Sequence, residues 1–220
     1  MKLGILWDLD GTLLDTLDDL TDATNHVMRR FGYRSHSKDA VRLFVGNGAR
    51  RLMEQAVPAG EDVDSALAAF QTYYAAHCQI KTGPYPGIMD ALRKLGETYP
   101  MAVVSNKPDA AVKPLCAQYF PGLYARGESA DCPRKPAPDM VFKAMEAIGV
   151  EKCIYVGDSE VDVLTAKNAG VPCLSVLWGF RDRWAMLEAG GSHFCDDPAK
   201  LEDIIAEIVK NYRSNKASLV

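Results

Sequence analysis

An apolar run that ends in two aspartates constrains this sequence more than any other feature. Residues 3–7 (Leu-Gly-Ile-Leu-Trp) form a short, bounded apolar run, which is typical of a buried strand in a parallel sheet. Asp8 and Asp10 follow, and on an extended backbone the alternation of side chains sends both carboxylates to the same side. Gly11 then allows a sharp turn. Because neighbouring carboxylates repel each other, this pair suits a cation site, or a nucleophile and an acid, better than a structural contact.

The order of the expected helices and strands predicts an α/β fold. From residue 85 onward, apolar strands alternate with helical stretches, which is typical of a doubly wound, Rossmann-like parallel sheet. Between about residues 17 and 82 the spacing is helical without a strand pattern, and this is far more chain than one crossover needs. We therefore expect an α/β core made of residues 1–16 and 83–220, with a small all-helical cap domain inserted at 17–82.

Composition and charge argue against several classes of partner. The chain has 220 residues and a formal net charge of −4, so it lacks the basic footprint of a nucleic-acid binder. No apolar run reaches membrane-spanning length, and the N-terminus leads into a strand without a signal-peptide pattern. The 6 cysteines and 4 histidines are scattered, without the close spacing of metal ligands. These observations favour a cytoplasmic protein with no nucleic-acid partner and no membrane partner.

Polar side chains recur where the expected strands end. Besides the first two aspartates, the candidates are Ser105, Asn106, Lys135, Asp158 and Asp162. Ligands of doubly wound sheets bind at the carboxyl ends of the strands, so one crevice can hold all of these groups. Each cluster after the first, taken singly, is more often a turn, a helix cap or a solvated linker. Their occurrence together and in order favours a functional site.

The clusters resemble the four motifs of the haloacid dehalogenase-like superfamily, most of whose members are Mg²⁺-dependent phosphohydrolases. The segment DLDGTL, at residues 8–13, is similar to the first motif, and the resemblance extends over essentially the whole core. It implies that Asp8 is a nucleophile that forms an aspartyl-phosphate, and that Asp10 is the acid and base. It also implies that Lys135 lowers the repulsion between the phosphate and Asp8.

The same resemblance implies which residues bind the ion and the phosphate. Mg²⁺ prefers oxygen ligands, and the expected ones come from Asp8, Asp10 (its backbone carbonyl), Asp158 and, in the outer shell, Asp162. The residues expected at the phosphoryl group are Leu9, Ser105, Asn106 and Lys135. The expected cofactor is therefore Mg²⁺, and the expected partner is a small phosphorylated metabolite.

Residues 44–56 are similar to the cap loop and helix of bacterial phosphoglycolate phosphatases, in which a glycine-rich turn precedes a helix facing the active site. A helix N-terminus at Asn47 and Gly48 would offer free N–H groups, and Arg50 or Arg51 could pair with a small carboxylate. The alternative is that both arginines are solvated helix charges. The resemblance thus favours 2-phosphoglycolate as the substrate.

Other activities are alternatives to this interpretation. Dehalogenases and phosphonoacetaldehyde hydrolases of the superfamily lack the second aspartate, so Asp10 argues against both. A phosphatase for pyrophosphate, a nucleotide or a sugar phosphate stays open, as does a phosphosugar mutase, because mutases share all four motifs. A catalytically silent relative that binds a metabolite or a protein is a further alternative. The intact set of Asp8, Asp10, Lys135 and Asp158 disfavours it.

Overall fold

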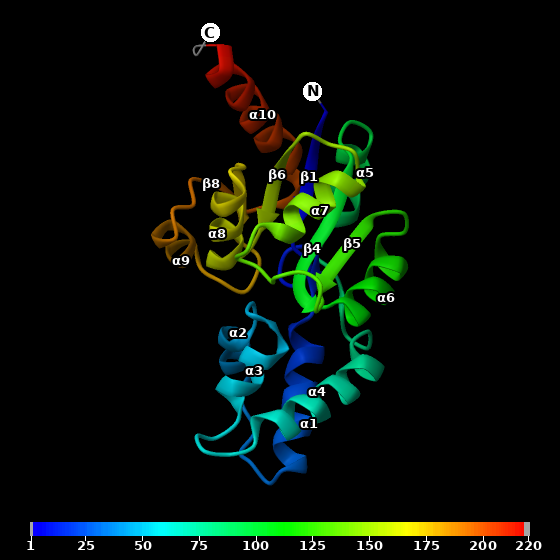
Figure 1. Cartoon of the computed structure of the whole chain (residues 1–220), viewed down its shortest axis with the longest axis vertical. Helices are drawn as coiled ribbons and strands as arrows, with labels where there is room; N and C mark the ends of the chain where they lie inside the picture. The colour runs from blue at the N-terminus through cyan, green and yellow to red at the C-terminus, as the bar shows by residue number, and fades with distance from the viewer. Residues whose placement is uncertain (1, 218–220) are drawn as a thin grey trace.

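A parallel six-stranded sheet forms the centre of the molecule, with the strand order β5-β4-β1-β6-β7-β8 (Figure 1). The computed structural model describes residues 2–217, with side chains through residue 211. The strands are β1 (Leu3–Trp7), β4 (Met101–Pro108), β5 (Tyr124–Glu128), β6 (Lys152–Gly157), β7 (Cys173–Val176) and β8 (His193–Cys195). Because β1 lies between β4 and β6, the residues after all three strands share one edge of the sheet.

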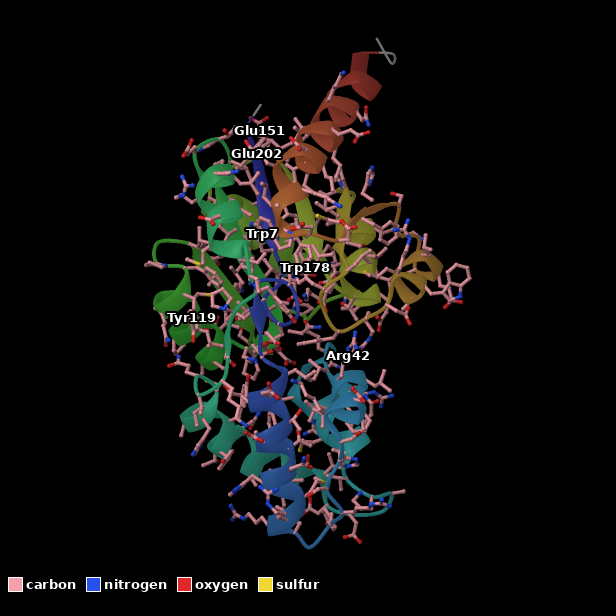
Figure 2. All side chains as sticks on the ribbon, turned by 180° about the vertical axis from the view of Figure 1, so that it is seen from behind. Trp7, Arg42, Tyr119, Glu151, Trp178 and Glu202 are labelled. Carbon is pink, nitrogen blue, oxygen red and sulfur yellow. The ribbon has the colours of Figure 1, made fainter. Side chains whose placement is uncertain are left out.

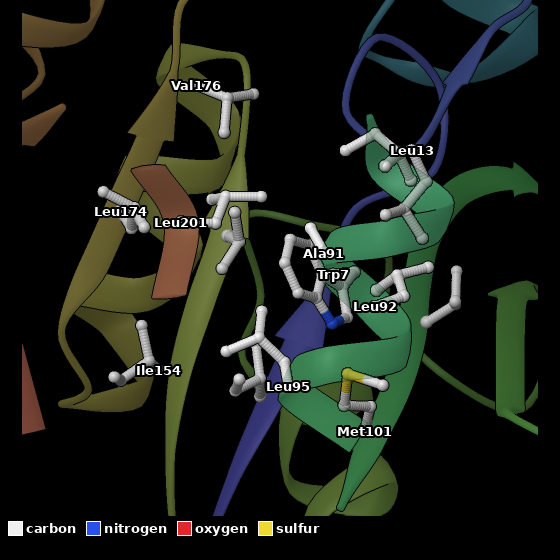
Figure 3. Packing of buried hydrophobic residues seen from close by; sticks show 14 of the residues in the cluster. Trp7, Leu13, Ala91, Leu92, Leu95, Met101, Ile154, Leu174, Val176 and Leu201 are labelled. Atoms are coloured by element: carbon white, nitrogen blue, oxygen red, sulfur yellow. The ribbon is translucent and has the colours of Figure 1, made fainter. Parts of the chain in front are cut away.

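Helices cover both faces of this sheet. Alternation along β1 places Ile5 and Trp7 on one face and Leu6 on the other. The first face packs against α5 (Ile88–Gly96), α6 (Asp109–Tyr119) and α10 (Leu201–Ala217), and the second against α7 (Asp139–Ala147) and α8 (Glu160–Ala169). Figure 3 shows Trp7 among Leu92 and Leu95 of α5. The doubly wound α/β sheet expected from the sequence is confirmed.

Two further short elements follow β7 in the chain. They are a short helix, α9 (Arg183–Glu188), and a 3-10 turn, η1 (Pro198–Lys200), and neither was expected from the sequence.

All six cysteines are free thiols. Within residues 2–217, no helix combines the length and the apolar character that crossing a membrane would require.

Four helices form a second hydrophobic cluster beyond the carboxyl ends of the strands (Figure 1). They are α1 (Leu17–Arg30), α2 (Lys38–Phe44), α3 (Gly48–Ala56) and α4 (Val63–His77), together called the four-helix unit below. Their shared core includes Leu20, Val27, Leu52 and Phe70. Helices occupy the segment where the sequence predicted them, and the expected domain boundaries at 16/17 and 82/83 stay a prediction.

Two short strands join the four-helix unit to the sheet. β2 (Leu14–Asp15) pairs with β3 (Gly83–Pro84) in an antiparallel ribbon, so the two passages of the chain lie side by side. The sequence did not indicate these strands, because two residues are too few for a periodic pattern. Asp19, at the start of α1, strengthens the connection, since its buried carboxylate accepts hydrogen bonds from the N–H groups of residues 80–82 at 2.9–3.0 Å.

Candidate active site

Asp8 lies directly after β1, with its carboxylate against a buried lysine. The Nζ atom of Lys135 donates to Asp8 Oδ1 at 2.8 Å and to Asp162 Oδ1 at 2.7 Å. Burial, only partly opposed by Lys135, raises the pKa of Asp8 to about 7. Burial also disfavours the charged form of Lys135, but Asp162 and Asp8 outweigh it and raise the pKa of the lysine. Asp8 is thus a carboxylate held in place by one ammonium group.

Asn106 fixes the backbone that carries this lysine. Its side-chain carbonyl accepts a hydrogen bond from the Lys135 N–H at 2.8 Å, and its side-chain amide donates to the Lys135 carbonyl at 3.0 Å. The same amide donates to the carbonyl of Gly46 at 3.2 Å. The sequence predicted phosphate binding for Asn106, and the structure gives its side chain a positioning role that the sequence did not indicate.

Three buried carboxylates gather at the ends of β1 and β6. One oxygen each from Asp8, Asp158 and Asp162 lies within 4.8 Å of the others. Burial raises the pKa of Asp158, and repulsion from Asp162 and Asp8 raises it further. The ammonium group of Lys135 pairs with Asp8 and Asp162, so with all three carboxylates ionised two negative charges remain for a divalent cation to balance. An all-oxygen set of this charge fits a hard divalent cation.

Asp158 and Asp162 are both held by hydrogen bonds from the protein. The backbone N–H of Phe180 donates to Asp158 Oδ2 at 2.6 Å. Asp162 Oδ2 accepts from the N–H and the hydroxyl of Ser159, at 3.1 and 2.6 Å, which caps the start of α8. Asp162 therefore joins the acidic cluster and orients Lys135, in addition to the outer-shell role expected for it.

The carboxylate of Asp10 forms an ion pair with a second buried lysine, Lys107, which the sequence analysis did not identify. The Nζ atom of Lys107 donates to Asp10 Oδ1 at 2.7 Å and to the hydroxyl of Tyr74 at 2.6 Å. Burial opposes the charge of Lys107, yet Asp10 and Tyr74 raise the pKa of the ammonium group above its usual value. The available signal was a lysine directly after Ser105 and Asn106, at the end of an apolar strand.

Two other predicted phosphate ligands lie at the same edge. Ser105 is buried in β4, and its hydroxyl accepts from the N–H of Lys107 at 3.2 Å while lining the cavity described below. Leu9 is fully buried, and its side chain belongs to the core of the sheet. Leu9 can therefore meet a phosphate through its backbone alone.

The active-site cavity has a volume of about 50 Å³ and lies between the sheet and the four-helix unit. Its polar floor is formed by Asp8, Asp10, Ser105, Asn106, Lys107, Lys135 and Asp158. The four-helix unit contributes a mainly apolar wall, with Leu20, Val45, Leu52 and Phe70, besides the hydroxyl of Tyr74. The cavity is thus small, with cations and carboxylates at one end and hydrocarbon at the other.

Two arginines dock the four-helix unit onto the loop after β7. Arg42 donates to the carbonyls of Phe180 at 2.8 Å and Gly179 at 3.1 Å, and Figure 2 shows it at the junction. In return, Arg181 donates to the carbonyls of Arg42 at 2.9 Å and Val45 at 2.6 Å, near the C-terminus of α2. Of the two arginines, Arg181 also lines the cavity.

The residues predicted from the cap loop divide between the cavity and the surface. Gly48 lines the cavity, whereas Asn47 and Arg50 do not. The Asn47 carbonyl accepts from Arg134 at 3.0 Å. The half-exposed guanidinium of Arg50 pairs with Asp64 at 2.8 Å, which favours the alternative of a solvated helix charge over a carboxylate ligand. Arg51 is also exposed and pairs with Glu54, one turn along the helix.

The order of these groups along the chain is that of a known protein family. A sequence model of the haloacid dehalogenase-like hydrolases matches residues 5–176, a span that contains every residue of the acidic cluster. The chain belongs to this family. The resemblance expected from the first motif is confirmed.

Relatives of known name refine this assignment. Phosphoglycolate phosphatase 1 of Pseudomonas aeruginosa is 34% identical over 222 residues, with 93% of this chain and 81% of the relative covered. A phosphoglycolate phosphatase of Rhodobacter capsulatus is 36% identical over 196 residues, with 82% and 87% covered. The expectation that the chain is an enzyme, a hydrolase of the phosphatase type, is confirmed.

Solved structures share the architecture. A protein from Lactobacillus delbrueckii subsp. bulgaricus, provisionally described as a phosphoglycolate phosphatase, matches with a TM-score of 0.86 at 37% identity. That match covers 92% of this chain and 97% of the other. A haloacid dehalogenase-like hydrolase from Streptococcus pneumoniae matches with a TM-score of 0.85 at 22% identity, covering 93% and 98%. At 22% identity, the second match is evidence of a shared fold only.

Proposed function

We propose that this chain is a Mg²⁺-dependent phosphatase that acts on 2-phosphoglycolate through an aspartyl-phosphate on Asp8. The observation that carries the proposal is the buried cluster of Asp8, Asp158, Asp162 and Lys135 beneath a small cavity. Two relatives at 34% and 36% identity are named phosphoglycolate phosphatases, which supports the choice of substrate.

The reaction has two steps that use the two aspartates after β1. First, an oxygen of Asp8 attacks phosphorus, the bond to the leaving oxygen breaks, and Asp10 gives that oxygen its proton. Second, a water attacks the phosphorus of the aspartyl-phosphate, Asp10 accepts the water proton, and the bond to Asp8 breaks to release phosphate. Asp10 thus returns to its protonated form, and Asp8 to its carboxylate.

The surrounding groups hold charge where the reaction needs it. Lys135 lies 2.8 Å from Asp8 and lowers the repulsion between this carboxylate and the incoming phosphate. Asp8 and Asp158 would hold Mg²⁺, which when bound supplies positive charge beside the transferring phosphoryl group. We expect the Ser105 hydroxyl, which lines the cavity, and the backbone near Leu9 to donate to the phosphoryl oxygens.

The cavity favours a small organic group on the phosphate. With the four-helix unit against the sheet, its volume of about 50 Å³ suits a small group better than a hexose or a nucleoside. The apolar wall suits the methylene group of the substrate. Its carboxylate can pair with Lys107 or Arg181, which line the cavity, whereas Arg50 pairs with Asp64 outside the cavity. We take residues 17–82 to be a cap that opens to admit the substrate. A cytoplasmic location would fit a metabolite substrate and stays a prediction.

A panel of phosphorylated metabolites tests the proposal. With Mg²⁺ we expect kcat/KM to be at least about tenfold higher for 2-phosphoglycolate than for pyrophosphate, a hexose phosphate or a nucleoside monophosphate. A chelator should abolish activity, and so should Asp8→Asn, because an amide cannot form the phosphoryl ester. Asp22→Asn makes the same chemical change at an exposed site and should keep full activity.

The panel also discriminates the alternatives. A mutase would move phosphate to a second hydroxyl group, and the assay would detect no free phosphate. A higher kcat/KM for a larger substrate would overturn the choice of phosphoglycolate. Ordinary turnover in Asp8→Asn would overturn the nucleophile.

A further inference from the structure

A lysine that takes no part in the two proton transfers described above connects the four-helix unit to Asp10. Lys107 lies near the end of β4, and the exposed fraction of its side chain is 2%. Its Nζ atom is 2.7 Å from Asp10 Oδ1 and 2.6 Å from the hydroxyl of Tyr74. The first partner belongs to the loop after β1, and the second belongs to α4. One ammonium group therefore bridges the sheet and the four-helix unit.

Asp10 depends on this ammonium group for its orientation. Asp10 lies in the loop between β1 and β2, next to Gly11 at φ +85°. Among the residues that the structure describes, Lys107 is the partner of its carboxylate in both the hydrogen bonds and the ion pairs. A carboxyl group that must meet a leaving oxygen needs a fixed position, and here a single contact provides it.

Tyr74 in turn fixes the lysine from the side of the four-helix unit. Its ring stacks on Phe70 of the same helix, with 5.3 Å between the ring centroids, and the residue is almost fully buried. The Nζ atom of Lys107 lies 4.6 Å from the centroid of the Tyr74 ring, so a cation–π contact adds to the hydrogen bond. Both contacts require α4 to lie against the end of β4. They would be lost if the unit moved away.

We propose that Lys107 and Tyr74 are positioning residues that orient the Asp10 carboxyl group for proton transfer when the four-helix unit closes on the sheet. This inference rests on the proposed acid and base role of Asp10. Closure then does two things at once, because it encloses the substrate and completes the contact that aims the acid. With the unit open, Lys107 loses both contacts with Tyr74, and Asp10 is less tightly held.

Leaving-group dependence tests the proposal, because a poor leaving group needs the proton of Asp10 and a good one does not. Phenyl phosphate and para-nitrophenyl phosphate have similar rings and differ in leaving-group basicity. We expect Lys107→Met to lower kcat for phenyl phosphate by about 100-fold, and that for the nitrophenyl ester by less than about tenfold. Tyr74→Phe, which keeps the aromatic ring, should lower kcat for phenyl phosphate by about tenfold and should lower kcat for the nitrophenyl ester by less.

Matched variants separate the possible outcomes. Tyr73→Phe changes the neighbouring tyrosine of α4, which stacks on His26 and His77, and should show no bias. Asp10→Asn should show the largest difference between the losses of kcat on the two esters, and adding Lys107→Met to it should not increase that difference. If Lys107→Met does not fold, Tyr74→Phe provides the measurement.

Each failure has its own signature. Equal losses on both esters in Asp10→Asn would overturn the acid and base role, and this inference with it. The inference alone would be overturned if Asp10→Asn lost more activity on phenyl phosphate than on the nitrophenyl ester while Lys107→Met and Tyr74→Phe lost equal activity on both. Equal losses are what a purely structural ion pair would produce.

Discussion

Asp8 and Asp10 are two positions apart in the chain, yet each has its own buried lysine. Lys135 reaches Asp8 from the loop before α7, and Lys107 reaches Asp10 from β4. An unpaired buried charge is costly, so each lysine is tolerated because a carboxylate lies within 2.8 Å of it. Asp8 also faces Asp158 and Asp162, whereas Asp10 faces Tyr74 through its lysine. These different surroundings support the proposed roles of Asp8 as nucleophile and Asp10 as acid.

Arg50 provides a prediction at the scale of one residue. Since its guanidinium faces solvent and pairs with Asp64, Arg50→Ala should change kcat/KM for 2-phosphoglycolate by no more than about twofold. Steady-state kinetics with 2-phosphoglycolate and para-nitrophenyl phosphate provide the measurement. A rise in KM for 2-phosphoglycolate alone would contradict this prediction and would indicate that Arg50 contacts the substrate carboxylate.

The connection between the sheet and the four-helix unit matters at the scale of elements. A ribbon of two residues on each strand is too short to be stable by itself. The carboxylate of Asp19 adds hydrogen bonds from three consecutive N–H groups and from the Thr82 hydroxyl, at 2.8–3.0 Å. The start of α1 and the chain that returns to β3 are thereby fixed to each other.

Asp19→Ala should weaken this connection. The substitution removes the acceptor of buried N–H groups, and we expect the free energy of unfolding to fall by about 3 kcal/mol. Asp22→Ala is the matched control, because Asp22 is exposed and forms an ion pair with Lys81, and it should cost less than about 1 kcal/mol. Urea denaturation of both variants measures the difference, and equal losses would contradict the role of Asp19.

At the scale of the whole molecule, the acidic cluster couples folding to pH. The pKa of Asp8 is raised from 3.8 to about 7, chiefly by burial, so the folded protein binds this proton more tightly than the unfolded chain. The stabilisation from Asp8 is therefore complete below about pH 4 and is lost as the pH rises through 7. Near neutral pH, carboxylate repulsion opposes folding unless a cation balances it.

Mg²⁺ should consequently stabilise the protein more at high pH than at low pH. Protons compete with the ion for Asp8, so we expect a larger rise in Tm on adding Mg²⁺ at about pH 8 than at about pH 5.5. Differential scanning fluorimetry after chelator treatment measures both values. Asp158→Asn should reduce the shift at both pH values, and an equal or larger shift for the wild type at low pH would contradict the coupling.

The sequence by itself determined the features that depend on short-range pattern. The apolar run at 3–7 and the alternation of helix and strand predicted a doubly wound sheet, because the periodicity and order of apolar residues are local properties. The same order placed Asp8, Ser105 and Asp158 at strand ends, and parallel strands bring such ends together.

Only the tertiary structure decided which partner each polar side chain has. Nothing local distinguishes Lys107, which becomes buried against Asp10 and Tyr74, from Arg50, which faces solvent. The clamp of Asn106 on Lys135 and the β2–β3 ribbon likewise join segments distant in sequence. The physical reason is that a hydrogen bond or an ion pair depends on atoms within about 3–4 Å, and packing alone determines which distant residues come that close.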